Sequence, residues 1–179
     1  HARCQDSAAQ PGYRLPPPEI VELADAKPVP SASIQPRLKE KIVYFQRTPM
    51  LTLEDLAAPA LKLAGARFNP CTLVHHGTHG PDLYHTSIAV QDVASGAPPT
   101  PVRGLPEGVR IGHAAWSPDG KRLAFALRTA ETGDDCASRL WMLDVDSAAV
   151  APVEPEQRLN AVLGTPFSWT PDSGALVVR

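Results

Sequence analysis

The clearest pattern along the chain is a short sequence that occurs twice and predicts a tight β-hairpin each time. Trp116-Ser-Pro-Asp-Gly-Lys-Arg-Leu and Trp169-Thr-Pro-Asp-Ser-Gly-Ala-Leu begin 53 positions apart. In both, the tryptophan ends an expected strand, the proline presets φ in the turn, and the aspartate bonds its own backbone. Gly120 and Gly174 are expected to supply the positive φ that closes each turn.

The residues after the first turn alternate as a strand requires. Leu123, Phe125 and Leu127 fall on one face, and two alanines fall between them on the other. This period of two predicts a strand that returns antiparallel to the one ending at Trp116.

A second pair of segments repeats at almost the same interval. Ile88-Ala-Val-Gln-Asp-Val-Ala-Ser and Leu140-Trp-Met-Leu-Asp-Val-Asp-Ser begin 52 positions apart, and each is an apolar strand closed by a turn of small residues. A further short strand is expected near 101–103 and near 150–153. Four antiparallel strands in roughly 50 residues, in meander order, are typical of one blade of a β-propeller.

A degenerate first copy of the repeat precedes these segments. In it Pro36 corresponds to Pro118, 82 positions later. The excess over 53 predicts an insertion at 48–82, between the second and third strands of the first blade.

This insertion holds the only helical pattern in the chain. Thr52 and Asp55 have capping-box spacing, Pro59 weakens the helix from within, and Gly65 is placed to end it. The expected helix is short or kinked, and its apolar face consists of Leu53, Leu56, Ala57, Ala60, Leu61 and Ala64.

The chain is therefore expected to be an all-β protein made of incomplete β-propeller blades. Two blades and part of a third cannot close a ring, so the native protein is expected to continue, covalently or as a docked second fragment. The predicted parts are a tail and proline-rich lead-in (1–29), a first blade with its insertion (30–104), a second blade and linker (105–163), and the start of a third blade, truncated at Arg179 (164–179).

Composition narrows the possible partners. The hydrophobic share of 43% supports a folded chain, and the net charge of −2 without a basic stripe argues against nucleic acid. Without an apolar run of about 20 residues, no membrane span is expected. Cys4, Cys71 and Cys136 form no C-x-x-C pair, so zinc and thioredoxin-like motifs are not indicated, and whether a disulfide forms stays open.

Catalytic motifs are absent from this sequence. It contains no Gly-x-Ser-x-Gly elbow and no glycine-rich phosphate loop. His75, His76 and His79 are close together, but neighbouring glycines and the lack of a nearby glutamate favour a solvated loop over a metal site. We expect no catalytic residue, no metal and no cofactor in this chain.

The remaining polar and aromatic candidates divide into structural and functional ones. Trp116 and Trp169 are expected to pack between blades. Arg67 is the one candidate for substrate binding, because a guanidinium at the end of the insertion helix can bind a carboxylate through two parallel hydrogen bonds. Four aspartates recur at matching positions of the repeat and are expected in turns and at strand ends: Asp92, Asp119, Asp144 and Asp172.

Several segments together resemble glutamyl endopeptidases of the prolyl oligopeptidase family of serine peptidases. The resemblance extends over nearly the whole chain. Its more specific parts are Tyr13-Arg-Leu-Pro-Pro-Pro-Glu-Ile and Lys62-Leu-Ala-Gly-Ala-Arg67, joined by Asp25-Ala, Leu53-x-x-Leu56-Ala, Leu105-Pro-Glu-Gly108, the Trp116 turn and Leu159-Asn-Ala-Val162.

The resemblance implies a larger peptidase with an N-terminal propeller and a C-terminal α/β-hydrolase domain. Serine, aspartate and histidine of that domain would lie beyond Arg179 and would cleave peptides by nucleophilic attack. The propeller would limit entry to peptides and flexible segments, and glutamyl members select an acidic residue before the scissile bond. The partners implied are peptide substrates and the C-terminal remainder of the same protein.

Our leading hypothesis is that the chain is the propeller portion of such a peptidase, in the periplasm or secreted. The alternative is a non-enzymatic periplasmic propeller that binds other proteins. A third possibility is a peptidase nicked near Arg179, so that two chains remain in one molecule.

Overall fold

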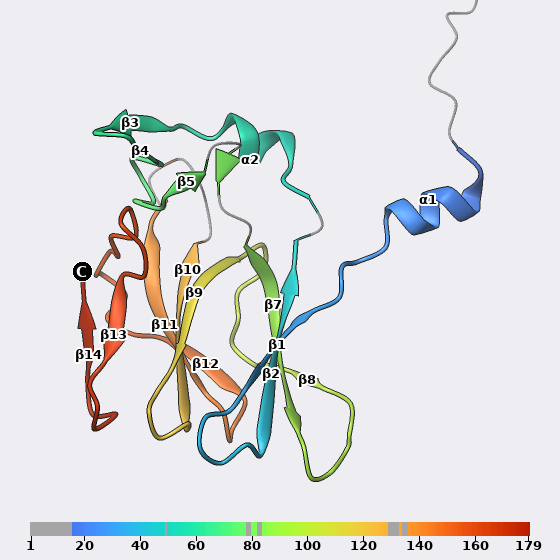
Figure 1. Ribbon diagram of the computed structural model, residues 1–179, viewed down its shortest axis with the longest axis vertical. Coiled ribbons are helices and arrows are strands. Elements are labelled where there is room, and N and C mark those ends of the chain that lie inside the picture. Colours follow the sequence, from blue (N-terminus) through green and yellow to red (C-terminus); the bar gives the residue numbers. More distant parts are fainter. Residues whose placement is uncertain (1–15, 49, 78–79, 82–83, 129–132, 134–135) are drawn as a thin grey trace, which may run out of the picture.

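The computed structural model describes residues 16–48, 50–77, 80–81, 84–128, 133 and 136–179, and these form mainly antiparallel strands (Figure 1). In chain order the elements are α1 (Pro18–Ala24), β1 (Ser31–Ile34), β2 (Lys41–Arg47), α2 (Leu53–Ala57), β3 (Leu61–Leu63), β4 (Ala66–Phe68), β5 (His76–Gly77), β6 (Gly80–Pro81), β7 (His85–Asp92), β8 (Thr100–Pro101), β9 (Arg110–Trp116), β10 (Arg122–Arg128), β11 (Ser138–Asp144), β12 (Ala149–Pro152), β13 (Phe167–Trp169) and β14 (Leu176–Val178).

The strands of the described residues form two four-stranded antiparallel meanders and three separate two-stranded sheets, β3–β4, β5–β6 and β13–β14. The first meander contains β1, β2, β7 and β8, and the second contains β9 to β12. A single residue pair between β7 and β9, His85 with Ile111, joins them into one eight-stranded sheet, in which β7 also pairs with β8. Strands β13 and β14 form the third hairpin, so the two tryptophan hairpins lie in different sheets. The predicted all-β class is confirmed.

The central strand β10 is buried on both faces. Leu123, Phe125 and Leu127 pack with residues of the first meander, while Ala124 and Ala126 pack toward the third hairpin. The alternation in the sequence thus corresponds to two different cores, with the large side chains in one and the small ones in the other. The second meander is therefore covered by apolar contacts on either side.

Each tryptophan of the repeat contacts the unit before it. The indole Nε1 of Trp116 donates to Ser33 Oγ at 2.8 Å, and that of Trp169 donates to the carbonyl of Ala115 at 3.0 Å. Ser33 and Ala115 are 82 positions apart, the same interval that relates Pro36 to Pro118. The predicted packing of the tryptophans between units is confirmed, and the contact recurs at equivalent positions.

The first of the two repeat turns closes as predicted, and the second closes differently. Gly120 has φ of +78°, as expected, and a Cβ there would lie 2.6 Å from the carbonyl oxygen of Pro36. In the second turn, however, Ser173 and not Gly174 adopts the positive φ, at +61°. Ser173 is buried, and its hydroxyl accepts a hydrogen bond from the amide of Asp119 at 3.0 Å. That contact with the preceding turn offsets the backbone cost of a serine in this conformation.

The insertion lies between β2 and β7, and Figure 1 shows it across one end of the sheets. The capping box of Thr52 and Asp55 is confirmed, but α2 has only five residues. The expected extension of the helix to Ala64 was wrong, because β3 and β4 form a hairpin there. Pro59 interrupts the helix, and Ala64 and Gly65 both have positive φ, which suits a two-residue hairpin turn.

Helix α1 was not predicted, since 1–29 was read as a tail and lead-in. It begins with Pro18, whose fixed φ suits the first turn, and it buries none of its residues. It extends away from the sheets in Figure 1.

A buried carboxylate anchors the insertion to the second meander. Asp55 is 1% exposed and accepts hydrogen bonds from Thr52 N at 2.9 Å, Tyr84 Oη at 3.1 Å and an Arg110 guanidinium nitrogen at 2.7 Å. Burial raises the pKa of Asp55, but the hydrogen bonds from Thr52 and Tyr84 and the charge of Arg110 together lower it below the ordinary value.

Two further links connect the insertion with later parts of the chain. Cys71 and Cys136 form a disulfide with a Cα–Cα distance of 5.9 Å. Val74 pairs with Ala161 in a parallel bridge. The insertion of the first meander is therefore held mainly by residues of the second meander and of the segment that follows it.

We predict that Asp55→Asn destabilises the fold by about 3–5 kcal/mol, because it removes the charge of the buried carboxylate that pairs with Arg110. Lys41→Ala is the matched control. It breaks the more exposed Lys41–Asp92 ion pair, whose N–O distance is 2.9 Å. This change is expected to cost less than about 1 kcal/mol. Urea denaturation measures both; equal losses would contradict the anchoring role.

We also predict an energetic coupling between Trp116 and Ser33. In a double-mutant cycle of Trp116→Phe and Ser33→Ala, the coupling energy should be about 0.5–1.5 kcal/mol, the value of one hydrogen bond. Replacing Trp141, which does not contact Ser33 through a hydrogen bond, serves as the control and should be additive with Ser33→Ala. Additivity in the Trp116 cycle would contradict the contact.

Candidate functional site

Two cavities flank the β3–β4 hairpin where it meets the segment 160–164. We call the first the apolar cavity; it has a volume of about 470 Å³ and is lined by Leu63, Ala64, Ala66, Phe68, Leu73, Asn160, Val162, Leu163 and Arg179. We call the second the histidine cavity; it has a volume of about 510 Å³ and is lined by Gly65, Ala66, His75, His113, Ala161, Val162, Leu163 and Gly164.

The β3–β4 hairpin has one apolar and one cationic face. Leu61 pairs with Phe68 and Leu63 with Ala66, whereas Lys62 pairs with Arg67. Because side chains alternate along a strand, Lys62 and Arg67 lie on the same face, opposite the one that lines the apolar cavity. Two like charges directly across a hairpin repel each other, so this face favours an anion.

The sequence predicted that Arg67 lies at the end of the insertion helix. This placement was wrong, because Arg67 lies in β4. It is half-buried, and among the described residues it makes no hydrogen bond or ion pair. The nearest cation in the hairpin register is Lys62, which is exposed. The guanidinium is therefore available to a carboxylate from outside the described residues, and its role in substrate binding stays a prediction.

The histidine cluster is split by the fold. His75 lines the histidine cavity and is half-buried, whereas His76 in β5 is 4% exposed, so the expectation of a solvated loop was wrong for His76. His76 pairs with Pro81 in the short β5–β6 ladder and is therefore part of a strand. His79 lies outside the described residues. Among the described residues, no group of three or more metal-binding side chains comes together.

His113 is a site residue that sequence reasoning missed. It lies in β9 at a bulge, where the register with β10 shifts between Phe125 and Ala126. Its φ is +37°, an uncommon value for a residue with a side chain. The signal available in the sequence was Gly112, which interrupts the strand pattern just before His113.

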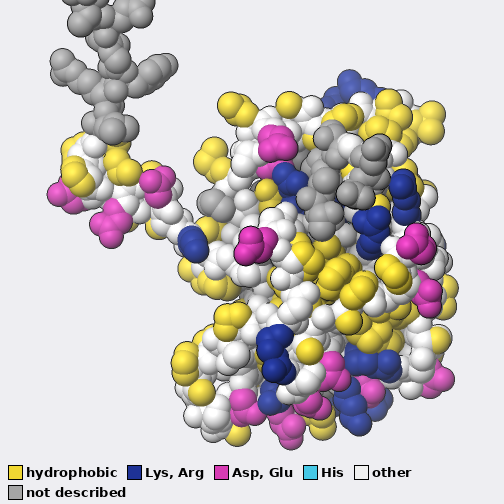
Figure 2. Space-filling view, turned by 180° about the vertical axis from the view of Figure 1, so that it is seen from behind, with side chains coloured by type: hydrophobic (Ala, Val, Ile, Leu, Met, Phe, Trp, Pro, Cys, Tyr) yellow, Lys and Arg dark blue, Asp and Glu magenta, His cyan; other side chains and the backbone are white. Residues whose placement is uncertain are grey.

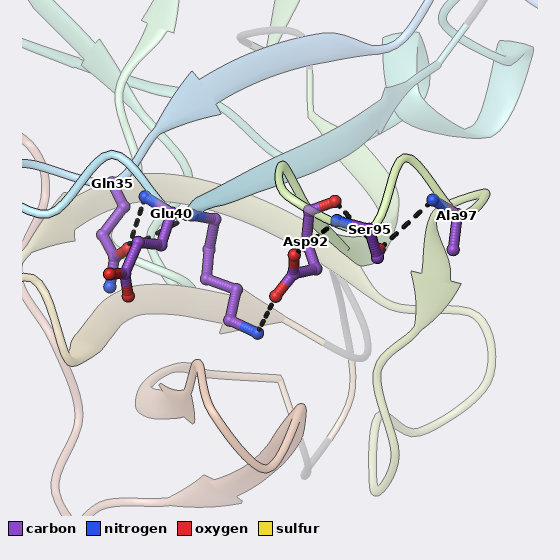
Figure 3. Close-up of polar contacts among 6 residues, drawn as sticks. Gln35, Glu40, Asp92, Ser95 and Ala97 are labelled. Atoms are coloured by element: carbon purple, nitrogen blue, oxygen red, sulfur yellow. Dashed lines mark hydrogen bonds and ion pairs between the residues drawn. The ribbon is translucent and has the colours of Figure 1, made fainter.

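The four repeated aspartates are confirmed as turn residues. Asp92 accepts from Ser95 N at 3.0 Å, as Figure 3 shows, and from Lys41 Nζ at 2.9 Å. Backbone amides also donate hydrogen bonds to the carboxylates of Asp144 at 2.9 Å, Asp119 at 3.1 Å and Asp172 at 2.9 Å. They serve four separate turns. In Figure 2 acidic and basic side chains are mixed at the end of the molecule opposite the insertion, and apolar side chains gather between the two ends.

Hydrogen bonding controls the ionisation of these aspartates. The pKa of each lies below its ordinary value, and the first cause is a side-chain hydrogen bond, from Lys41 to Asp92, for example. Acid–base catalysis near neutral pH requires a pKa closer to that pH, so the shifts suit structural carboxylates. Burial lowers the pKa of His85, which contacts Ser31 in the first meander at 3.2 Å.

The cationic face of the hairpin is suited to binding an anion. Lys62 and Arg67 pair across it, and neither cavity beside the hairpin has an aspartate or glutamate in its described lining. None of the helices in the described part of the chain is long and apolar enough to cross a membrane.

The fold and this site define an all-β chain of stacked antiparallel sheets with a candidate anion-binding surface. No protein-family model matches the chain. It is similar to two curated plant proteins named "Probable glutamyl endopeptidase, chloroplastic", with 38% identity over 177 residues to that of Oryza sativa subsp. japonica and 35% over 171 residues to that of Arabidopsis thaliana.

The similarity covers 96% and 93% of this chain but only 18% and 17% of the two plant proteins. The chain thus spans less than a fifth of the length of these relatives, whose names place them in the chloroplast. Among solved structures, a GH74 xyloglucanase from Xanthomonas campestris matches 77% of this chain and 24% of its own, with 18% identity and a TM-score of 0.32.

We predict that stability falls steeply in acid. Asp55 and the four turn aspartates have a pKa lowered by folding, whereas in the unfolded chain it is about 3.9. The stabilisation is therefore fully present above the unfolded pKa and is lost as the pH falls through the folded values. Urea denaturation from about pH 7 to pH 2.5 measures it, and Asp119→Asn should flatten the slope below about pH 4. A pH-independent free energy would contradict the shifts.

Proposed function

We propose that this chain is the N-terminal propeller portion of a serine peptidase of the prolyl oligopeptidase family, which hydrolyses peptides after glutamate. The observation that carries the proposal is the similarity of 96% of the chain to a protein named as a probable glutamyl endopeptidase. The catalytic serine, histidine and aspartate are assigned to an α/β-hydrolase domain outside this chain. No catalytic residue is assigned within it.

The stacking of the sheets supports a propeller. The second meander is covered on both faces, and both tryptophan contacts relate a unit to the one before it in the same way. Repetition of one such contact around an axis generates a ring of sheets. In the proposed peptidase this ring admits peptides and flexible segments to the active site and excludes folded proteins.

The cationic face of the β3–β4 hairpin supports a preference for acidic substrates. Arg67 has no anionic partner among the described residues, and Lys62 lies directly across from it. A guanidinium forms two parallel hydrogen bonds with a carboxylate, which fixes its orientation as well as its charge. We assign Arg67 to the glutamate side chain of the substrate.

The disulfide supports a compartment that is not strongly reducing. Disulfides persist in the periplasm and outside the cell, and they are rare where thiols are kept reduced. The Cys71–Cys136 link is consistent with a periplasmic or secreted protein, which stays our prediction beside the chloroplast location in the names of the relatives.

The test is Arg67→Ala in the longer protein that contains this chain. For a peptide with glutamate before the scissile bond, kcat/KM should fall about ten- to hundred-fold, the value of a charge-assisted hydrogen bond. The matched glutamine peptide should change little, as should both peptides with the control Lys121→Ala, an exposed lysine in a turn of the second meander.

Two results would contradict parts of this proposal. An equal loss with the glutamate and glutamine peptides would remove the assigned role of Arg67. A longer protein that binds other proteins but cleaves no peptide would favour the non-enzymatic alternative.

A further inference from the structure

We propose that the Cys71–Cys136 disulfide is a redox switch, which holds the insertion on the second meander and releases it when a dithiol reduces the bond. The inference goes beyond the proposed function and does not depend on it. The two cysteines come from different parts of the fold. Cys71 lies in the insertion after β4, and Cys136 lies just before β11, so the bond joins the insertion to the second meander across 65 positions.

Apolar packing contributes little to the attachment of the insertion. Neither apolar core of the described structure contains a residue of the insertion. Its larger apolar side chains include five that are each more than half exposed to solvent: Met50, Leu53, Leu56, Leu61 and Leu63. Because a segment with few buried apolar contacts opens locally at a lower free-energy cost than a packed sheet, the insertion can detach while the sheets stay folded.

The buried side chains of the insertion are mainly polar. Val74 is apolar, and the other buried residues in its described part are Thr48, Asp55, Asn69, Thr72 and His76. The hydroxyl of Thr72, next to Cys71, has no hydrogen-bond partner among the described residues. Burial of a hydroxyl without a partner costs free energy that is recovered when water reaches the group, so this position favours opening once the covalent bond is broken.

The chain around Cys71 is a turn at 69–74 with its own hydrogen bonds. Asn69 Oδ1 accepts from the amide of Cys71 at 2.8 Å, and the carbonyl of Asn69 accepts from the amide of Leu73 at 2.9 Å. The disulfide joins this turn to the second meander, and Ala161 N joins it to a later segment by donating to the carbonyl of Leu73 at 2.8 Å. Reduction leaves the backbone hydrogen bond to hold the turn in place.

The reduction is an ordinary thiol–disulfide exchange. A thiolate of the dithiol attacks the sulfur of Cys71, because Cys71 is half-buried whereas Cys136 is fully buried. The S–S bond breaks, a mixed disulfide forms at Cys71, and Cys136 leaves as a thiolate that takes up a proton. The second thiol of the reductant loses its proton and attacks the mixed disulfide. The reductant ends as a disulfide, and both cysteines end as thiols.

Detachment of the insertion changes the candidate site. The apolar cavity and the histidine cavity each lie between the β3–β4 hairpin and the segment 160–164. This hairpin lies across one end of the sheets (Figure 1), and it also contains Arg67. Movement of the hairpin away from the sheets therefore opens both cavities and displaces Arg67.

The test is hydrogen–deuterium exchange, read by mass spectrometry, on the longer protein that contains this chain, before and after treatment with dithiothreitol. Reduction should speed the exchange of the Ala161 amide, whose acceptor is the carbonyl of Leu73, by about ten-fold or more. Amides of β3 and β4 should respond in the same way. Amides of β10 should keep their slow exchange, and reoxidation should restore the original rates.

Two variants separate the disulfide from other effects of the reductant. The double variant Cys71→Ser, Cys136→Ser should exchange at the rate of the reduced protein, with or without dithiothreitol. Cys4→Ser removes a cysteine that does not take part in the bond, and it should respond to dithiothreitol as the parent protein does.

Two results would overturn the inference. Unchanged exchange in the insertion and at Ala161 after reduction would show that the other contacts hold the insertion by themselves. An equal acceleration in β10 would show that the disulfide stabilises the whole fold and switches no part of it. Neither readout depends on peptide cleavage, so both results are independent of the proposed function.

Discussion

The burial of β10 on both faces is the constraint on which the rest of the structure depends. Its large side chains on one face and its alanines on the other belong to two different apolar clusters, so the strand needs apolar cover on each side. The first meander fills one side and the third hairpin fills the other. The repeated tryptophans then set how far one sheet is displaced relative to the next, because each indole has a single donor and it is used at equivalent positions.

The insertion lies across one end of these sheets and connects the two meanders. It belongs to the first meander in sequence, but its anchors, Asp55 to Arg110 and Cys71 to Cys136, lie in the second. The candidate site depends on this contact between the insertion and the second meander, because the histidine cavity combines residues of the insertion with His113 of β9. A binding surface assembled in this way rests on sheets that are already rigidly packed.

Sequence reasoning found the repeated units because their signals are local. Period-two alternation, the tryptophan turns and the capping box of Thr52 all act within a few residues. It failed where tertiary contacts decide between local alternatives. The hydroxyl of Ser173, which takes the positive φ, bonds to the neighbouring turn, and His76 is buried although the residues around it suggest an exposed loop. The fold class was thus predictable, while the cavity beside His113 depended on a bulge for which Gly112 is the one local signal in the sequence.

The disulfide has a consequence for the way these parts are connected. Its two cysteines are separated by 65 positions, and the chain between them includes β7, β8, β9 and β10. Strands of both meanders therefore belong to one covalently closed loop, and even after complete unfolding they cannot move apart as independent chains. The loss of conformational freedom in that unfolded loop raises the relative stability of the folded state. The two meanders, which only one residue pair joins within their sheet, are thereby linked covalently as a single topological unit.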